Sequence, residues 1–175
     1  MKKNYKEIMN QINTFIFDVD GVLTNGFVHV FANGELARQM NIKDGYAIKV
    51  AVDMGYRVCI ISGGTNEGVR NRLKGLGIED IYLGVHNKIE KLYELIDMYQ
   101  LTADKILYMG DDIPDFEVMQ KVGLATCPND AVPEIQKISQ YISQKKGGEG
   151  CVRDVIEQVL KVQGKWHQQF DAKFD

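Results

Sequence analysis

The sequence predicts an α/β fold with a doubly wound, mostly parallel sheet. Short apolar runs alternate with helical segments along the chain, and the links between them are short. This alternation is typical of parallel strands joined by helices that cover both faces of a sheet. The 175 residues contain no linker and no internal repeat, so we expect a single domain over residues 1–175.

Six short apolar runs are predicted as strands. The first, Phe15–Phe17, leads directly into Asp18 and stops before Gly21. An apolar run bounded by a turn signal is typical of a buried strand. The others cover residues 57–61, 81–83, 105–109, 122–126 and 141–142.

Helical periodicity and capping side chains predict the segments between these strands. Helices are expected over residues 4–11, 44–54, 88–99, 132–138 and 152–162, and another begins near Pro114. Asp44 is placed to cap the second of these, and Thr65 or Asn66 to cap a helix that runs to Lys74. Residues 164–175 are expected to form a polar tail.

An insertion of about residues 26–40 follows the first strand. Two extended segments flank Asn33-Gly34, which is the strongest short signal for a β-hairpin. Its apolar residues are too few to form a core, and an isolated hairpin is marginally stable in water. We expect it to pack against another subunit in a homo-oligomer; the alternative is that it lies on its own domain.

Composition excludes several classes of function. The net charge of −3 gives no overall attraction to nucleic acids or acidic membranes. No apolar run reaches the roughly 18 residues of a membrane span, and the first residues lack the apolar core of a signal peptide. The three scattered cysteines show neither zinc spacing nor a disulfide framework, which favours a reducing, cytoplasmic location.

Polar side chains follow four of the predicted strands. They are Asp18 and Asp20, then Ser62, then Lys88, and finally Asp111, Asp112 and Asp115. The carboxyl ends of parallel strands share one edge of the sheet, so these groups can converge there. Clustered carboxylates suit Mg²⁺, and a lysine and a hydroxyl beside that cation suit a phosphate group.

Each group taken alone also has an ordinary explanation. Lys88 could be a solvated residue at a helix start, Ser62 a turn residue, and the pair at 111–112 a helix cap. The strand could end in a solvated turn at Asp18-Val19-Asp20-Gly21. A calcium loop is a poor alternative, because Val22 and Leu23 stand where that motif needs an oxygen ligand and its glycine. The full combination favours a metal and phosphate site.

This order of motifs resembles the phosphatases of the haloacid dehalogenase superfamily, with their Rossmann-like fold. Their first motif, DxDGxLT, matches residues 18–24 in full. Ser62 matches the second motif, Lys88 the third, and residues 110–115 match the fourth, GDDxxD. The matched motifs lie along about 100 residues, from 18 to 115.

Three further segments are similar to the small, capless 3-deoxy-D-manno-octulosonate 8-phosphate (KDO 8-phosphate) phosphatases. These are residues 41–46, the pattern Gly84-Val85-x-x-Lys88, and the glycine-rich residues 147–153. The resemblance implies a Mg²⁺-dependent homotetramer of lipopolysaccharide precursor synthesis. In such a tetramer the hairpins form a central barrel, and a neighbour's surface replaces the missing cap domain.

The resemblance also implies roles for individual residues. Asp18 attacks phosphorus to form an aspartyl-phosphate, and Asp20 acts as general acid and then as general base. Mg²⁺ is held by the carboxylates of Asp18 and Asp111 and the backbone carbonyl of Asp20. The phosphate is bound by Ser62, Gly63 and Lys88, while Asp112 and Asp115 tune the surroundings of the metal.

For the sugar acid, the resemblance points to a segment at the start of the second helix and to three residues outside it. These are Asn41, Ile42, Lys43, Asp44 and Gly45, with Lys49, Gly64 and Arg72. An arginine suits the planar carboxylate of a 2-keto acid, which makes Arg72 a carboxylate partner. The alternative is that Lys49 and Arg72 are solvated helix residues.

Two departures from the family pattern bear on the substrate. Gly64 stands where many relatives carry an arginine, and Glu149 where many carry the arginine of GGRG. A nine-carbon keto-sugar acid 9-phosphate, of the KDN or sialic acid type, is therefore an alternative substrate. A non-catalytic oligomerisation module and a sugar-phosphate-binding protein without turnover are further alternatives, although no motif carboxylate is lost.

Overall fold

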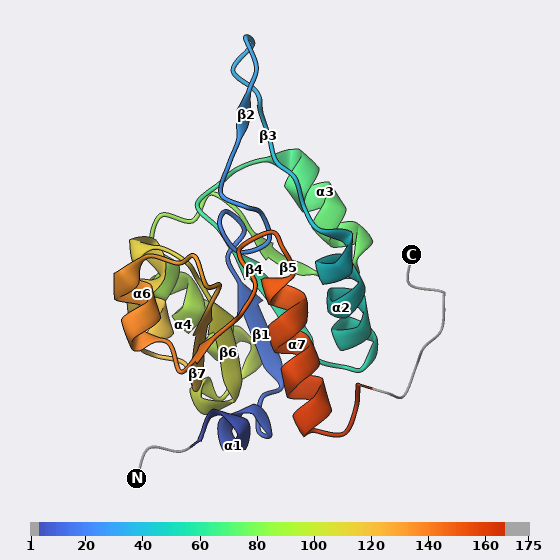
Figure 1. The fold of residues 1–175 in the computed structure, drawn as a ribbon, viewed down its shortest axis with the longest axis vertical. Coiled ribbons are helices and arrows are strands. Elements are labelled where there is room, and N and C mark those ends of the chain that lie inside the picture. The colour runs from blue at the N-terminus through green and yellow to red at the C-terminus, as the bar shows by residue number, and fades with distance from the viewer. Residues whose placement is uncertain (1–3, 167–175) are drawn as a thin grey trace.

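The computed structural model describes residues 4–166 and is built around one six-stranded sheet (Figure 1). The strand order is β5-β4-β1-β6-β7-β8, and each neighbouring pair is parallel. The bounds are β1 Thr14–Phe17, β4 Arg57–Ile61, β5 Asp80–Tyr82, β6 Ile106–Met109, β7 Leu124–Cys127 and β8 Tyr141–Ile142. The predicted fold class is confirmed, with no cap domain evident among the described residues.

Helices cover both faces of the sheet (Figure 1). One face carries α1 Tyr5–Met9, α2 Ile42–Asp53, α3 Glu67–Gly75 and α7 Cys151–Val162. The other carries α4 Lys88–Tyr99, α5 Phe116–Met119 and α6 Pro133–Ile138. Strand β1 contributes side chains to the hydrophobic cores on both faces of the sheet, because Phe15 and Phe17 point to the first face and Ile16 to the second. Short 3₁₀ turns span Ala103–Lys105 and Ile113–Asp115.

The predicted hairpin projects from the body of the molecule (Figure 1). It consists of β2 His29–Val30 and β3 Leu36–Ala37, paired antiparallel. Gly34 adopts φ +86° at the turn, which glycine reaches at little cost. Five large apolar side chains of this segment are exposed: Phe27, Val28, Val30, Phe31 and Leu36.

One predicted cap is wrong. Helix α2 begins at Ile42, and Asn41 caps it by accepting a hydrogen bond from the Lys43 amide. Asp44 lies inside the first turn and is 1% exposed. Its Oδ1 accepts from the Arg153 amide at 2.8 Å, so it caps α7, whose own N-cap residue is Gly150.

The end of the described chain packs onto this α2–α7 layer. Trp166 is buried against Tyr46 with ring centroids 6.5 Å apart. The expected polar tail over residues 164–175 otherwise lies outside the described residues. Within residues 4–166, no helix combines the length and apolar character that crossing a membrane requires.

Candidate active site

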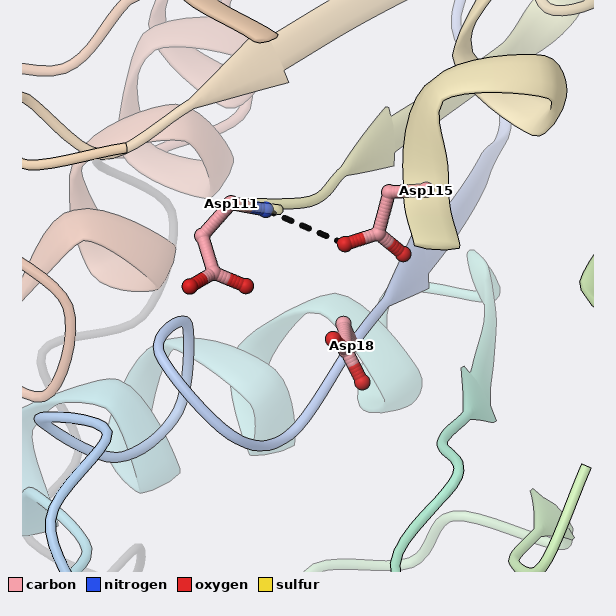
Figure 2. Close-up of side chains that lie close together, drawn as sticks. All are labelled: Asp18, Asp111 and Asp115. Carbon is pink, nitrogen blue, oxygen red and sulfur yellow. Dashed lines mark hydrogen bonds between the residues drawn. The ribbon is translucent and has the colours of Figure 1, made fainter. Parts of the chain in front are cut away.

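Three carboxylates meet at the carboxyl edge of the sheet (Figure 2). Asp18 directly follows β1, Asp111 follows the neighbouring strand β6 after one glycine, and Asp115 ends the 3₁₀ turn beyond it. One oxygen from each lies within 4.8 Å of the others. Figure 2 shows Asp18 and Asp111 directing their carboxyl groups into the same space, with Asp115 beside them. The predicted convergence of strand ends is therefore present.

Asp115 is fully engaged by neighbouring groups. Its Oδ1 accepts hydrogen bonds from the Tyr108 hydroxyl at 2.6 Å and from Lys88 Nζ at 2.7 Å. Its Oδ2 accepts from the Asp111 amide at 3.1 Å (Figure 2). The side chain packs so closely on Gly110 that an added Cβ there would lie 2.4 Å from it. Asp115 is thus suited to orienting the other groups rather than to binding an ion directly.

Lys88 is not a solvated residue at a helix start. It begins α4 behind the N-cap Asn87 and is only 6% exposed. Its Nζ lies 3.0 Å from Asp18 Oδ2 and 2.7 Å from Asp115 Oδ1. Burial lowers the pKa of Lys88, but the two carboxylates outweigh burial and raise it. A permanent positive charge therefore stands beside Asp18.

Negative charge still exceeds positive charge in this cluster. Burial, together with the charge of Asp115, raises the pKa of Asp18 to about 7. Burial and the charges of Asp18 and Asp115 raise the pKa of Asp111 to about 8. Crowded buried carboxylates hold protons unless a cation compensates them.

The geometry fits a divalent cation between Asp18 and Asp111. Asp111 lies over Gly21, where an added Cβ would stand 1.9 Å from its Oδ2. Gly21 adopts φ +83°, so a side chain there is disfavoured on two counts. Hard divalent ions prefer carboxylate oxygens as ligands. A bound cation would displace the protons that these carboxyl groups otherwise hold. The residues present therefore suit Mg²⁺.

Asp112 lies at the border of this cluster. It is exposed and accepts a hydrogen bond from the Ile113 amide at 2.7 Å, as an N-cap residue does. Its charge contributes to the raised pKa of Asp111. Its influence on the acid cluster is thus through charge.

Asp20 is held by a residue that the sequence did not single out. Arg38 Nε donates to Asp20 Oδ1 at 2.6 Å, and Arg38 Nη2 donates to Oδ2 at 3.2 Å. Arg38 directly follows β3, at the base of the hairpin. A lone arginine just after a hairpin strand matches no motif, so the sequence offered no signal by which to find it.

Ser62 and Gly64 lie beside Asp20 and Arg38, in the loop that follows β4. Ser62 is 2% exposed, and its Oγ accepts from the Gly64 amide at 3.3 Å. Backbone bonds from Val85 to Ser62 and from Gly84 to Gly64 fix the loop. The Cβ position of Gly64 lies 3.3 Å from Asp20 Oδ2 and 3.5 Å from Arg38 Nη2. Ser62 and Gly64 therefore lie beside Asp20 and Arg38.

The segment predicted to contact the sugar divides into exposed and buried parts. Asn41 donates through Nδ2 to the Gly148 carbonyl at 3.2 Å, while Ile42 and Lys43 are exposed. Asp44 is 1% exposed and its Oδ1 accepts from the Arg153 amide of α7, so a substrate cannot reach it. Within the described chain its Oδ2 finds no hydrogen-bond partner.

Arg72 is brought to the start of α2. An added Cβ at Gly45 would lie 2.6 Å from Arg72 Nη2. Lys49 is half-buried one helical turn after Gly45. Arg72 also lines, with Arg38, a groove of about 770 Å³ between the hairpin and α3.

The glycine-rich loop supports the nucleophile loop from the other side. An added Cβ at Gly147 would lie 1.9 Å from the Gly21 carbonyl oxygen. The Gly148 amide donates to the Val22 carbonyl at 3.0 Å. Glu149 is exposed. Close backbone approach explains the two glycines, and the acidic residue between them and Gly150 does not disturb it.

The chain is similar in sequence to a known family and to characterised proteins. Residues 80–156 match the model of the haloacid dehalogenase-like hydrolase family. The chain is 37% identical over 154 residues to the 3-deoxy-D-manno-octulosonate 8-phosphate phosphatase KdsC of Escherichia coli K12, covering 88% of this chain and 82% of that protein.

Solved structures show the same similarity. The 3-deoxy-D-manno-octulosonate 8-phosphate phosphatase of Yersinia pestis superposes with a TM-score of 0.92 at 32% identity, covering 95% of this chain and 90% of that one. The enzyme of that name from Moraxella catarrhalis, in complex with a magnesium ion, a phosphate ion and KDO, gives 0.92 at 28% identity, covering 100% of both chains.

Proposed function

This chain belongs to the haloacid dehalogenase-like hydrolases, in the branch of the KDO 8-phosphate phosphatases, and from this premise we propose that it hydrolyses KDO 8-phosphate. The observation that carries the phosphatase chemistry of this proposal is the buried Lys88 bridging Asp18 and Asp115 beside Asp111. This arrangement supplies a nucleophile, a phosphate-binding cation and an acidic pair for a metal ion in one place.

In the proposed reaction Asp18 is the nucleophile. Its Oδ1 accepts from the Val19 amide at 2.7 Å, and its Oδ2 lies against Lys88, so its orientation is fixed. It attacks phosphorus and forms an aspartyl-phosphate as the sugar oxygen leaves. Lys88 and the Ser62 hydroxyl bind the phosphoryl oxygens and offset their charge.

Asp18 and Asp111, with the backbone carbonyl of Asp20, would hold Mg²⁺. When bound, the ion reduces repulsion between the anionic nucleophile and the phosphate and stabilises charge in the transition state. Asp115 orients Lys88 and the Asp111 backbone. Asp20 protonates the leaving oxygen and then deprotonates the water that hydrolyses the intermediate, which contributes about 10²–10⁴-fold.

The substrate assignment rests on relatives and on the groups around the site. Asn41, Ile42, Lys43, Gly45, Lys49, Gly64 and Arg72 remain our candidates for sugar contacts. Arg72 is the candidate for the carboxylate, since a guanidinium binds a planar carboxylate through two hydrogen bonds. Asp44 is removed from this set because of its burial.

We also propose a homotetramer in which the hairpins meet. The exposed apolar side chains of the hairpin support it, with Phe27 at 76% and Val30 at 74% exposure. Such a patch on a protruding hairpin is unusual for a monomer. The three free, buried cysteines accord with our expectation of a cytoplasmic enzyme.

The test is phosphate release from KDO 8-phosphate and KDN 9-phosphate, measured side by side with and without Mg²⁺. We expect Mg²⁺-dependent release with a large preference for KDO 8-phosphate. Preference for the nine-carbon substrate would transfer the assignment, and Gly64 would then mark the difference. No release from either substrate or from an aryl phosphate would favour a non-catalytic module.

A further inference from the structure

Asp20 is oriented by a bidentate ion pair with the hairpin. Arg38 binds one carboxylate oxygen through Nε and the other through Nη2, at 2.6 and 3.2 Å. A fork of two parallel hydrogen bonds fixes the plane of a carboxylate as well as its position. The Asp20 carboxyl group therefore has a defined direction, although its side chain is 39% exposed.

The arginine itself is well fixed, unlike most surface ion-pair residues. Its side chain is only 10% exposed. The neighbouring hairpin residue Leu36 accepts a hydrogen bond through its carbonyl from Asn66 Nδ2 at 2.8 Å. Asn66 is also the N-cap of α3, accepting from the Val69 amide at 2.9 Å. The base of the hairpin is thus fastened to a helix on one side and to Asp20 on the other.

Gly64 leaves the room that this pair occupies. Its Cβ position is 3.3 Å from Asp20 Oδ2, 3.5 Å from Arg38 Nη2 and 3.7 Å from Ser62 Oγ. A longer side chain at 64 would compete for the space of the guanidinium. The absence of a side chain there and the presence of Arg38 therefore belong to one arrangement.

We propose that Arg38 is a positioning residue for Asp20 and that it links the hairpin to the reaction. It holds the Asp20 carboxyl group where the leaving oxygen of the substrate arrives. This inference rests on the proposed function, in which Asp20 is the general acid and base. If Arg38 acts through Asp20, mutating Arg38 should have little effect once Asp20 has been replaced. If Arg38 contacts the substrate directly, its mutation should have the same effect in both backgrounds.

The experiment is a double-mutant cycle on the Mg²⁺-loaded full chain with Arg38→Met, Asp20→Asn and both together. With KDO 8-phosphate we expect Arg38→Met to lower kcat about 10–100-fold, part of what acid–base catalysis supplies, with KM changed less than about threefold. In the Asp20→Asn background the same change should cost less than about threefold. Losses that multiply, or a loss confined to KM, would overturn the proposal.

The leaving group provides a second readout that a merely structural role would not move. Nitrophenolate needs little protonation to leave, so the burst of nitrophenolate from 4-nitrophenyl phosphate should fall less than about threefold in Arg38→Met. An equal loss on both substrates would contradict positioning of the acid. Arg38→Lys, which keeps the charge but not the fork, should fall between wild type and Arg38→Met.

Arg70→Met is the matched control. Arg70 pairs with Glu67 at 3.2 Å and donates to the Ile81 carbonyl, so its loss removes an arginine ion pair away from Asp20. It should leave kcat unchanged. If the wild type releases phosphate from another alkyl phosphate monoester but not from KDO 8-phosphate, the substrate assignment is wrong. The double-mutant cycle on that monoester then tests the role of Arg38. No turnover of any phosphate monoester would overturn both proposals.

Discussion

The acid cluster at the sheet edge and the hairpin above it are stabilised in different ways. In the cluster, Asp18, Lys88 and Asp115 are buried and bound by groups from β1, β6 and α4 of the same chain. The hairpin is two strands of two residues each, with its apolar side chains in solvent. The chain alone completes the protein part of the cluster, whereas it leaves the hairpin without a core.

The acid cluster and the hairpin differ in what each would need for its stabilisation. The cluster has an excess of negative charge, so a cation would complete it. The hairpin has an excess of apolar surface, so burial against protein would complete it. Arg38 joins the two regions, since it belongs to the hairpin and binds Asp20. The predictions below test each half separately.

A large loss of activity is expected from Gly21→Ala, which fills the space beneath Asp111. The added Cβ would lie 1.9 Å from Asp111 Oδ2 at a residue with φ +83°, so the Asp111 carboxylate must leave its present position. We expect Mg²⁺-dependent phosphate release to fall by about 10²-fold or more, as for a misplaced catalytic group. Steady-state kinetics and Mg²⁺ titration measure it.

Gly55→Ala separates crowding from backbone strain. Gly55 has a similar φ of +86°, but nothing lies within 4 Å of its Cβ position. It should lose about 1–2 kcal/mol of stability and keep full activity. Equal loss of activity in both variants would show that Gly21 acts through the backbone alone.

Mg²⁺ affinity should depend strongly on pH. The pKa values of about 7 for Asp18 and about 8 for Asp111 mean that protons occupy the cluster below these values. Mg²⁺ must displace them, so affinity should rise as pH increases, by about 10–100-fold between about pH 6 and 7. Isothermal titration in buffers of different ionisation heat reports the released protons. A constant affinity with no proton release would contradict the excess charge of the cluster.

The hairpin half is tested by Val30→Asp. Val30 is 74% exposed in one chain, so a single chain should tolerate the change, but a buried charge would disrupt the proposed hairpin contacts. Sedimentation velocity should show a tetramer for the wild type and smaller species for the variant. Met98→Asp, at an exposed apolar residue of α4, should keep the wild-type mass. A monomeric wild type at micromolar concentration would refute the tetramer.

Asp44 of α2 is a buried carboxylate outside both the acid cluster and the hairpin. Burial raises the pKa of Asp44 from its ordinary 3.8 to about 6, because it outweighs the opposing effects of the Arg153 amide and the Arg153 charge. A raised pKa means that the folded state binds the proton more tightly, so stability from Asp44 is present at low pH and is lost as pH rises through about 4 to 6.

Asp44→Asn removes this titration and keeps an acceptor for the Arg153 amide. Relative to wild type, its free energy of unfolding should rise by about 1–3 kcal/mol between about pH 4 and 6. Urea denaturation at several pH values measures the difference. Asp53→Asn, at an exposed acid of the same helix, controls for the lost charge. An equal slope in both variants would contradict the role of burial.

Much of the fold could be predicted because local patterns and the sheet agree. The apolar runs before Asp18 and Ser62 became β1 and β4, and the predicted helix over 88–99 is α4 as observed. The cap of α2 was misjudged because Asp44 and Asn41 are both good caps, and only the packing of α7 on α2 decides between them.

The convergence of Asp18, Lys88 and Asp111 could be predicted for the same reason, since strand order places their strand ends at one edge. Tertiary contacts outside the motifs could not. Arg38 reaches Asp20 through the path of the hairpin, and Tyr108 reaches Asp115 from inside a buried strand. No sequence motif around Arg38 or Tyr108 indicates which residue it contacts.

The most direct test of the acid cluster is phosphate release from KDO 8-phosphate by wild type and Asp18→Asn, each with and without Mg²⁺. We predict rapid release only by the wild type with Mg²⁺, and a folded but inactive variant with an unchanged far-UV circular dichroism spectrum. Substantial activity in Asp18→Asn, or wild-type release that persists after chelation, would contradict a cation-assisted covalent reaction at Asp18.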